Sequence, residues 1–130
     1  MARPLDFGHW SAHRLEALTC YQLSHGEAVA IGVALDMVYA SLLGWVTPVA
    51  CSRVVGVLRN CGLRAWSPEV ALRGTDGSLA LLEGLRQFRE HLGGELCVTL
   101  PDGLGARKEV HEIDERLLER AVELLCERYA

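Results

Sequence analysis

The stretch Ser24-His25-Gly26-Glu27-Ala28-Val29-Ala30-Ile31-Gly32 opens the most apolar part of the chain. Its first four residues follow the Ser-x-x-Glu pattern of a capping box, in which serine and glutamate satisfy the backbone N–H groups at a helix start. The apolar residues continue to about Leu43, and Gly44 then ends the pattern. The sequence therefore predicts a long helix from Ser24 to about Leu43 that is buried in the core.

Weaker patterns on both sides of this helix complete the predicted architecture. In chain order they are a helix at residues 7–21, a helix at 47–62, an irregular connection at 64–77, a helix from about 78 that ends at 93, a strand at 96–100, a strand at 109–111 and a helix at 113–129. The helices show apolar residues at three- and four-residue spacing, and the two strands flank a Pro-Asp-Gly turn. We predict one mainly α domain over residues 1–130, with a small β-hairpin.

Length and charge limit the function classes. The chain has 130 residues, half of them hydrophobic, which suits a single domain with a hydrophobic core. Its net charge is −4 and its basic residues are scattered, so we expect no nucleic-acid partner and no anionic membrane surface. The start lacks the apolar segment of a signal peptide, and Asp36 interrupts the apolar run at 28–46. We therefore expect a cytoplasmic location.

The five cysteines give no sign of a disulfide framework. They are odd in number, and no two of them show Cys-x-x-Cys spacing. Most fall in apolar helical or strand patterns, where a buried and reduced thiol is the usual state. We expect most of the five to be inert core residues: Cys20, Cys51, Cys61, Cys97 and Cys126.

Three of the five histidines lie at or near predicted helix starts. His9 and His13 are four residues apart and share one helix face, and a tight turn would bring His25 back toward His9. Clustered imidazoles suit a divalent cation or an acid–base site, although single histidines are more often surface or core residues. The spacing differs from His-Glu-x-x-His and so excludes a zincin metalloprotease.

Two motifs carry a resemblance to a known family. Residues 5–13 read Leu-Asp-Phe-Gly-His-x-x-x-His, with Glu16 three residues further on, and residues 25–32 read His-Gly-Glu-Ala-Val-Ala-Ile-Gly. This pair, in this order and at about this separation, resembles the C-terminal domain of dehydroquinate synthase and the related sugar-phosphate cyclases. The resemblance implies that residues 1–130 form the metal- and substrate-binding domain, without the N-terminal domain that binds NAD⁺.

The resemblance also implies roles for the three histidines. His9 and His25 match the two histidines that bind the family's Zn²⁺ or Co²⁺ ion, and His13 matches the histidine of proton transfer and phosphate contact. The third metal ligand, a glutamate, belongs to a part of the family's sequence that is absent here.

Substrate-binding positions depart from the family pattern. Asp6 stands where dehydroquinate synthases have Asn, and an acid there resembles the cyclases that make 2-epi-5-epi-valiolone from sedoheptulose 7-phosphate. His13, in contrast, is typical of dehydroquinate synthases. Arg3 corresponds to a substrate-binding arginine at a spacing one residue shorter, and Arg89 occupies the place of a lysine-rich phosphate-binding segment. The resemblance thus implies that Asp6, Arg3 and Arg89 contact a sugar phosphate.

The function that follows from the resemblance is a carbon–oxygen lyase of the 3-dehydroquinate synthase type. It would convert a sugar phosphate to a carbocycle with loss of phosphate, using NAD⁺ and a divalent metal. We expect this chain alone to be inactive, as a fragment or as one subunit of a split enzyme. Its expected partners are the sugar phosphate, a separate NAD-binding half and a second copy of the chain.

Two alternatives stay open at this point. One is a fragment of a 2-epi-5-epi-valiolone synthase-type cyclase, and the other is a non-catalytic helical module that serves assembly. A metal-dependent hydrolase of another family is disfavoured by the Phe-Gly-His context of His9. Trp10, in the first helical turn, fits core packing and a substrate-binding wall equally well.

Overall fold

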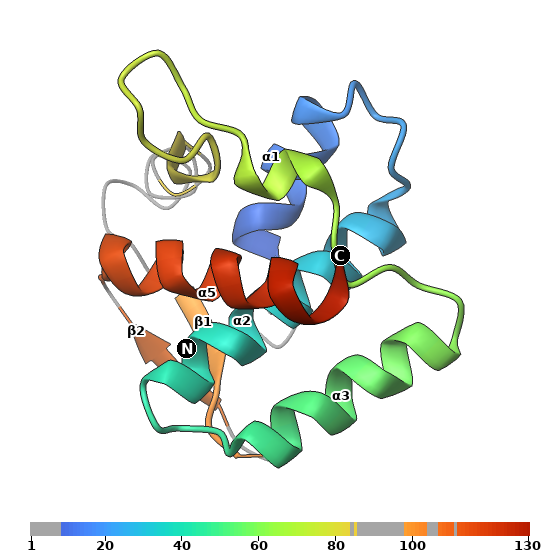
Figure 1. Ribbon diagram of the computed structural model, residues 1–130, viewed down its shortest axis with the longest axis vertical. Helices are drawn as coiled ribbons and strands as arrows, with labels where there is room; N and C mark the ends of the chain where they lie inside the picture. The colour runs from blue at the N-terminus through green and yellow to red at the C-terminus, as the bar shows by residue number, and fades with distance from the viewer. Residues whose placement is uncertain (1–8, 84, 86–97, 104–106, 111) are drawn as a thin grey trace.

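The structure is a computed structural model that describes residues 9–83, 85, 98–103, 107–110 and 112–130 (Figure 1). Helices dominate this part of the chain, and the strands form one antiparallel pair. The named elements are α1 (His9–Leu18), α2 (His25–Leu42), α3 (Pro48–Asn60), the 3₁₀ helix η2 (Pro68–Ala71), β1 (Val98–Pro101), β2 (Arg107–Val110) and α5 (Glu115–Tyr129). The predicted mainly α domain with a small hairpin is confirmed.

The capping box at the start of α2 forms as the sequence predicts. The Ser24 hydroxyl accepts a hydrogen bond from the Glu27 backbone N–H at 3.1 Å, and the Glu27 carboxylate accepts one from the Ser24 N–H at 3.2 Å. Helix α2 ends at Leu42, and Gly44 follows with a positive φ of 80°. The two sequence signals at the ends of this helix therefore fix its length.

The capping carboxylate makes helix stability depend on pH. The backbone N–H of Ser24 and then its hydroxyl lower the pKa of Glu27 from its ordinary value of 4.5. Because the pKa is lower in the folded state, the stabilisation is complete above the ordinary value and is lost as the pH falls through the folded value. We expect Glu27→Ala to be less stable than the native chain near pH 7, with a difference that shrinks in acid. Denaturant midpoints measured from pH 7 to pH 3 check this, and a difference independent of pH would contradict it.

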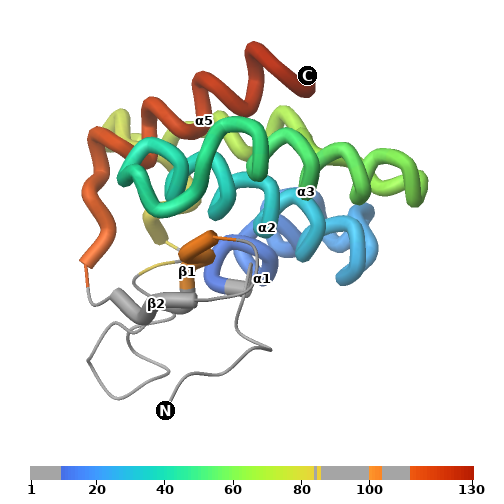
Figure 2. The backbone as a smooth tube through the Cα atoms, turned by 90° about the horizontal axis from the view of Figure 1, so that it is seen from below, coloured from blue at the N-terminus to red at the C-terminus, as the bar shows by residue number. Residues whose placement is uncertain are grey.

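Helix α2 is the centre of the fold. It contacts α1, α3, α5 and β1, and most of its residues are buried. Helix α5 crosses one side of α2, whereas β1 lies on the other side (Figure 2). Being surrounded explains why α2 is apolar over nearly its whole circumference. No helix in the described residues is both long enough and apolar enough to span a membrane.

The hairpin and α5 follow the sequence prediction closely. Val98 pairs with Val110 and Pro101 with Arg107, in antiparallel register. The expected strand residues at 96–97 and 111 lie outside the described part of the chain. Asp114 caps α5 by accepting hydrogen bonds from the first backbone N–H groups of that helix, and its own N–H donates to the Tyr39 hydroxyl at 2.9 Å. This bond ties the start of α5 to the last turn of α2.

The segment between α3 and β1 is only partly described. The predicted irregular connection contains η2 and an isolated β-bridge between Arg73 and Leu79. Residues 81–83 and 85 are helical, as predicted, whereas residues 78–80, also predicted as helix, form a bend, the β-bridge and a turn. Residues 84 and 86–93 of the predicted helix lie outside the described residues. Arg73 also contacts the Glu119 carboxylate on α5 at 2.6 Å, which fastens this connection to the last helix.

The prediction about the cysteines is wrong for most of those described. Only Cys51, on the inner face of α3, is buried, and burial raises the pKa of its thiol. Cys20 lies in the turn after α1, Cys61 caps the end of α3 and Cys126 is on the exposed side of α5. The exposed cysteines fall in a turn, at a helix end or on the outer face of a helix. Cys97 lies outside the described residues.

Candidate functional site

The turn between α1 and α2 places the two motifs side by side. At the end of α1 the backbone N–H of Tyr21 donates to the Glu16 carbonyl at 2.7 Å, and that of Cys20 donates to the Ala17 carbonyl at 3.1 Å. This pair of bonds is the Schellman pattern, whose left-handed position usually carries glycine. Here Cys20 has φ 54° and Tyr21 has φ 62°. Two successive left-handed residues reverse the chain, so that α2 begins beside α1.

This reversal brings His13 and His25 together. Their ring centroids are 5.9 Å apart, with an angle of 34° between the ring planes. The Glu16 Oε2 atom lies 3.3 Å from His25 Nδ1 and 3.5 Å from His13 Nδ1. The side chain of His13 is 68% exposed and that of His25 is 54% exposed, whereas the side chain of Glu16 is only 14% exposed. The arrangement is an accessible pair of imidazoles held against one partly buried carboxylate, and we call these three residues the His–Glu–His cluster.

Four of the predicted site residues have side chains outside the described part of the structure. His9 begins α1, but its side chain lies outside the described part of the structure, as do Arg3, Asp6 and Arg89 entirely. Among the side chains that are described, no group of three His, Cys, Asp or Glu residues is arranged to hold a metal ion. The roles expected for these four residues stay predictions.

Glu16 is the site residue that the sequence analysis did not single out as functional. It completes the first motif, and it lies three residues after His13, a spacing that puts both side chains on one helix face. From that spacing the sequence could have predicted the contact between Glu16 and His13. The contact with His25 depends on the left-handed turn, which no local pattern predicts.

Buried hydrogen bonds fix the helix that carries His13. Trp10 is buried, and its Nε1–H donates to Asp36 Oδ1 across 2.8 Å, which joins α1 to the middle of α2. One turn further along α1, Arg14 Nε donates to the Ala80 carbonyl at 3.3 Å in a partly buried hydrogen bond. Of the two interpretations of Trp10, the structure supports core packing. His13 and Glu16 therefore lie on a helix whose position is set by contacts with the core.

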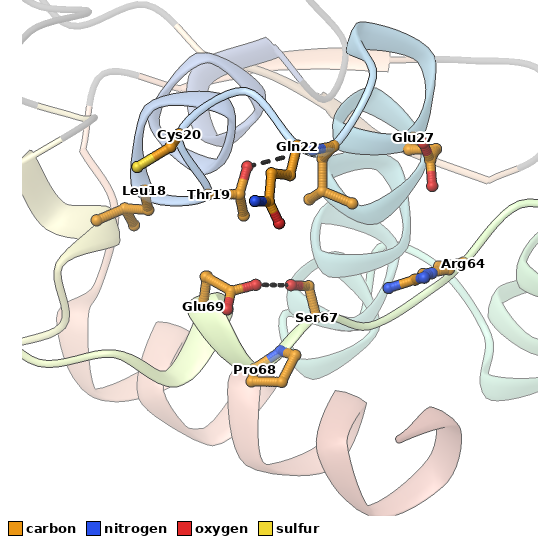
Figure 3. A pocket seen from close by; sticks show the side chains of 10 residues that line it. Leu18, Thr19, Cys20, Gln22, Glu27, Arg64, Ser67, Pro68 and Glu69 are labelled. Atoms are coloured by element: carbon orange, nitrogen blue, oxygen red, sulfur yellow. Dashed lines mark hydrogen bonds between the residues drawn. The ribbon is translucent and has the colours of Figure 1, made fainter.

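A pocket of about 400 Å³ opens beside the turn (Figure 3). Neither His13 nor His25 lines it. The hydroxyl of Ser67 donates to the Glu69 carboxylate within the pocket, so these two groups satisfy each other. The polar side chains of the lining are Thr19, Gln22, Glu27, Arg64, Ser67 and Glu69. Mixed charges and mutual hydrogen bonds in this lining select no particular class of ligand.

The fold and the cluster define a class of protein: a helical domain that presents two histidines and a glutamate from a pair of adjacent helices. Residues 1–80 match the family model described as 3-dehydroquinate synthase C-terminal, so the chain belongs to this family. The matched residues include both sequence motifs and all of α1, α2 and α3.

Individual relatives support the same family. The chain is 35% identical over 124 residues to the 2-epi-valiolone synthase of Actinosynnema mirum, covering 94% of this chain and 32% of the relative. It is 34% identical over 102 residues to the 3-dehydroquinate synthase of Caldanaerobacter subterraneus subsp. tengcongensis. This alignment covers 78% of this chain and 27% of that relative. The chain thus spans about a third of the length of the curated relatives that it matches.

A solved structure confirms the fold. It is the 2-epi-5-epi-valiolone synthase of Streptomyces hygroscopicus subsp. jinggangensis 5008, with NAD⁺ and Zn²⁺ bound. The TM-score is 0.86 at 32% identity, and the alignment covers 97% of this chain and 33% of that one. The helical domain described here therefore corresponds to one third of a larger enzyme architecture.

Proposed function

We propose that this chain is the C-terminal, metal- and substrate-binding part of a sugar-phosphate cyclase of the 3-dehydroquinate synthase type. The reaction eliminates phosphate from a sugar phosphate and closes a carbocycle. The observation that carries the proposal is the His–Glu–His cluster, in which two motif histidines from separate helices lie 5.9 Å apart on an accessible surface. The NAD⁺ site belongs to the N-terminal part of such an enzyme.

His25 has the surroundings of a metal-binding histidine. Zn²⁺ prefers imidazole nitrogens and carboxylate oxygens, and a metal-binding histidine usually donates its other N–H to a carboxylate. His25 has this second contact, since its Nδ1 lies 3.3 Å from Glu16 Oε2. In the proposal, His9 and His25 hold Zn²⁺ or Co²⁺, together with a glutamate from the N-terminal part. When bound, the metal acts as a Lewis acid toward substrate hydroxyl groups.

His13 fits proton transfer. Its side chain is 68% exposed, so a substrate can reach it, and a neutral imidazole accepts and returns protons near pH 7. We assign substrate contacts to Asp6, Arg3 and Arg89, where two guanidinium groups would pair with the phosphate and carboxylate of a sugar acid.

A chimaera tests the proposal. The C-terminal third of the Streptomyces hygroscopicus relative is replaced with this chain, and phosphate release is measured with NAD⁺, Zn²⁺ and either a heptulosonate phosphate or sedoheptulose 7-phosphate. We expect release that depends on both NAD⁺ and Zn²⁺, and none from this chain alone. A folded chimaera that binds Zn²⁺ no better than this chain and releases no phosphate would favour the non-catalytic module.

A second candidate activity, that of a 2-epi-5-epi-valiolone synthase, has its own support. Asp6 matches the acid of those cyclases, and the relatives with 35% and 33% identity are named as valiolone-type synthases. The substrate arms of the chimaera experiment separate the two activities. Turnover of sedoheptulose 7-phosphate alone supports the valiolone type, and turnover of the heptulosonate phosphate alone supports the dehydroquinate type.

A further inference from the structure

We propose that Glu16 is a positioning residue shared by His13 and His25, which holds both imidazoles in the tautomer that carries its proton on Nδ1. Metal binding by His25 rests on the proposed function, whereas the tautomer assignment rests on the geometry of this chain. The residue would thus act on the reaction through two other side chains.

The geometry of the cluster carries the assignment. Glu16 Oε2 lies within hydrogen-bond distance of His25 Nδ1, at 3.3 Å, and at an ion-pair distance of 3.5 Å from His13 Nδ1. An ionised carboxylate can only accept hydrogen bonds, so an imidazole nitrogen that faces it is stabilised when it carries the proton. Such charge-assisted bonds are roughly twice as strong as neutral ones. The oxygen therefore favours a proton on Nδ1 through a hydrogen bond in His25 and through the attraction of its negative charge in His13.

The turn after α1 fixes the backbone of Glu16. The Glu16 carbonyl accepts hydrogen bonds from the Tyr21 N–H at 2.7 Å and from the Thr19 hydroxyl at 3.2 Å. Both donors belong to the turn that also sets the start of α2. Because the Glu16 side chain is only 14% exposed, it has few alternative rotamers in solvent. Glu16 is thus held by the same turn that brings His25 to it.

The tautomer has a chemical consequence at each ring. A proton on Nδ1 places the basic lone pair on Nε2, which is then the nitrogen that binds a metal in His25 and accepts a proton in His13. When His13 takes up a proton, the resulting imidazolium lies beside the Glu16 carboxylate, which stabilises the positive charge as the aspartate of a Ser–His–Asp triad does. One carboxylate would therefore prepare both the metal ligand and the base.

Nitrogen-15 NMR of the ring nitrogens tests the tautomer directly. Spectra of the full chain are recorded at about pH 8.5, where histidine side chains are ordinarily neutral. We expect Nδ1-protonated patterns for His13 and His25 in the native chain. Glu16→Ala should return both rings to mixed tautomers, and Glu16→Gln should have a smaller effect. Glu27→Gln, which keeps the capping pattern of α2, is the matched control and should leave both rings unchanged.

The chimaera supplies the second measurement. We expect Glu16→Ala to weaken Zn²⁺ binding by about 10- to 100-fold, as found for other carboxylates that support metal-binding histidines. Native ring patterns in a folded Glu16→Ala variant would overturn the assignment, even if the chimaera is active. Mixed tautomers in Glu16→Ala, with no Zn²⁺ binding by the native chimaera, would uphold the positioning role and refute the metal site.

Discussion

His13→Ala is expected to lower the kcat of the chimaera by about 10²- to 10⁴-fold, the range typical of a lost general acid–base group. The side chain of His13 is exposed and contacts Glu16, so its removal takes away a proton carrier without opening a cavity in the core. Because Zn²⁺ binding is assigned to other residues, the affinity for Zn²⁺ should change much less than kcat. Phosphate release and Zn²⁺ titration measure the two effects separately.

Two further variants test whether His13 transfers protons or only positions its neighbours. His13→Asn keeps a side-chain hydrogen-bond donor near Glu16 but has no group that titrates near pH 7, so it should be nearly as inactive as His13→Ala. Arg53→Ala, at an exposed position of α3, should retain native activity. An active His13→Asn chimaera would show that His13 only positions its neighbours, and would remove it from the proton-transfer step.

Asp36→Ala is expected to destabilise the chain by about 2–4 kcal/mol. Asp36 is 1% exposed and accepts the Trp10 indole N–H at 2.8 Å. Its removal leaves a buried donor without this acceptor, which costs about 1–3 kcal/mol, and the space of the lost side chain adds to that cost. Chemical denaturation of the full chain, followed by circular dichroism, measures the change.

Asp36→Asn is the matched control for this substitution. The amide oxygen can still accept the indole N–H, and the volume is almost unchanged, so the loss should be clearly smaller than for Asp36→Ala. Equal losses in the two variants would mean that the negative charge of Asp36, and not the bond to Trp10, stabilises the contact between α1 and α2.

The sequence predicted the parts of the fold that local signals determine. Helix α2 has a capping box at one end and Gly44 at the other, and both act within a few residues of the helix terminus. The hairpin and α5 were also predicted, because strands that flank a Pro-Asp-Gly turn and apolar residues at helical spacing are equally local signals. Element boundaries moved by only a few residues.

The turn after α1 could not be predicted from local sequence signals. Cys20 and Tyr21 both adopt positive φ, a conformation that usually carries glycine or asparagine. Tertiary packing of α1 against α2 outweighs the local preference here, and a single sequence gives no sign of it. The cysteine prediction failed for a related reason, since apolar neighbours do not determine which face of a helix a cysteine occupies.

The site was predicted only as a set of residue types. The motifs named His13 and His25, and the structure brings these two rings together. The shared oxygen of Glu16 could not be anticipated, because it depends on the distance between two helices. His9, Asp6, Arg3 and Arg89 still rest on the resemblance, and the chimaera experiment is the means of testing them.

The compactness of the cluster in sequence has a consequence for folding. His13, Glu16 and His25 belong to two successive helices joined by one short turn. Contacts between such neighbours close only short loops, at a small entropic cost, and tend to form early. The three side chains can thus come together as a nascent unit before α5 docks on α2. Mutations in elements far from this turn, such as α5, should then lower the stability of the folded domain more than they change the arrangement of the His13 and His25 rings.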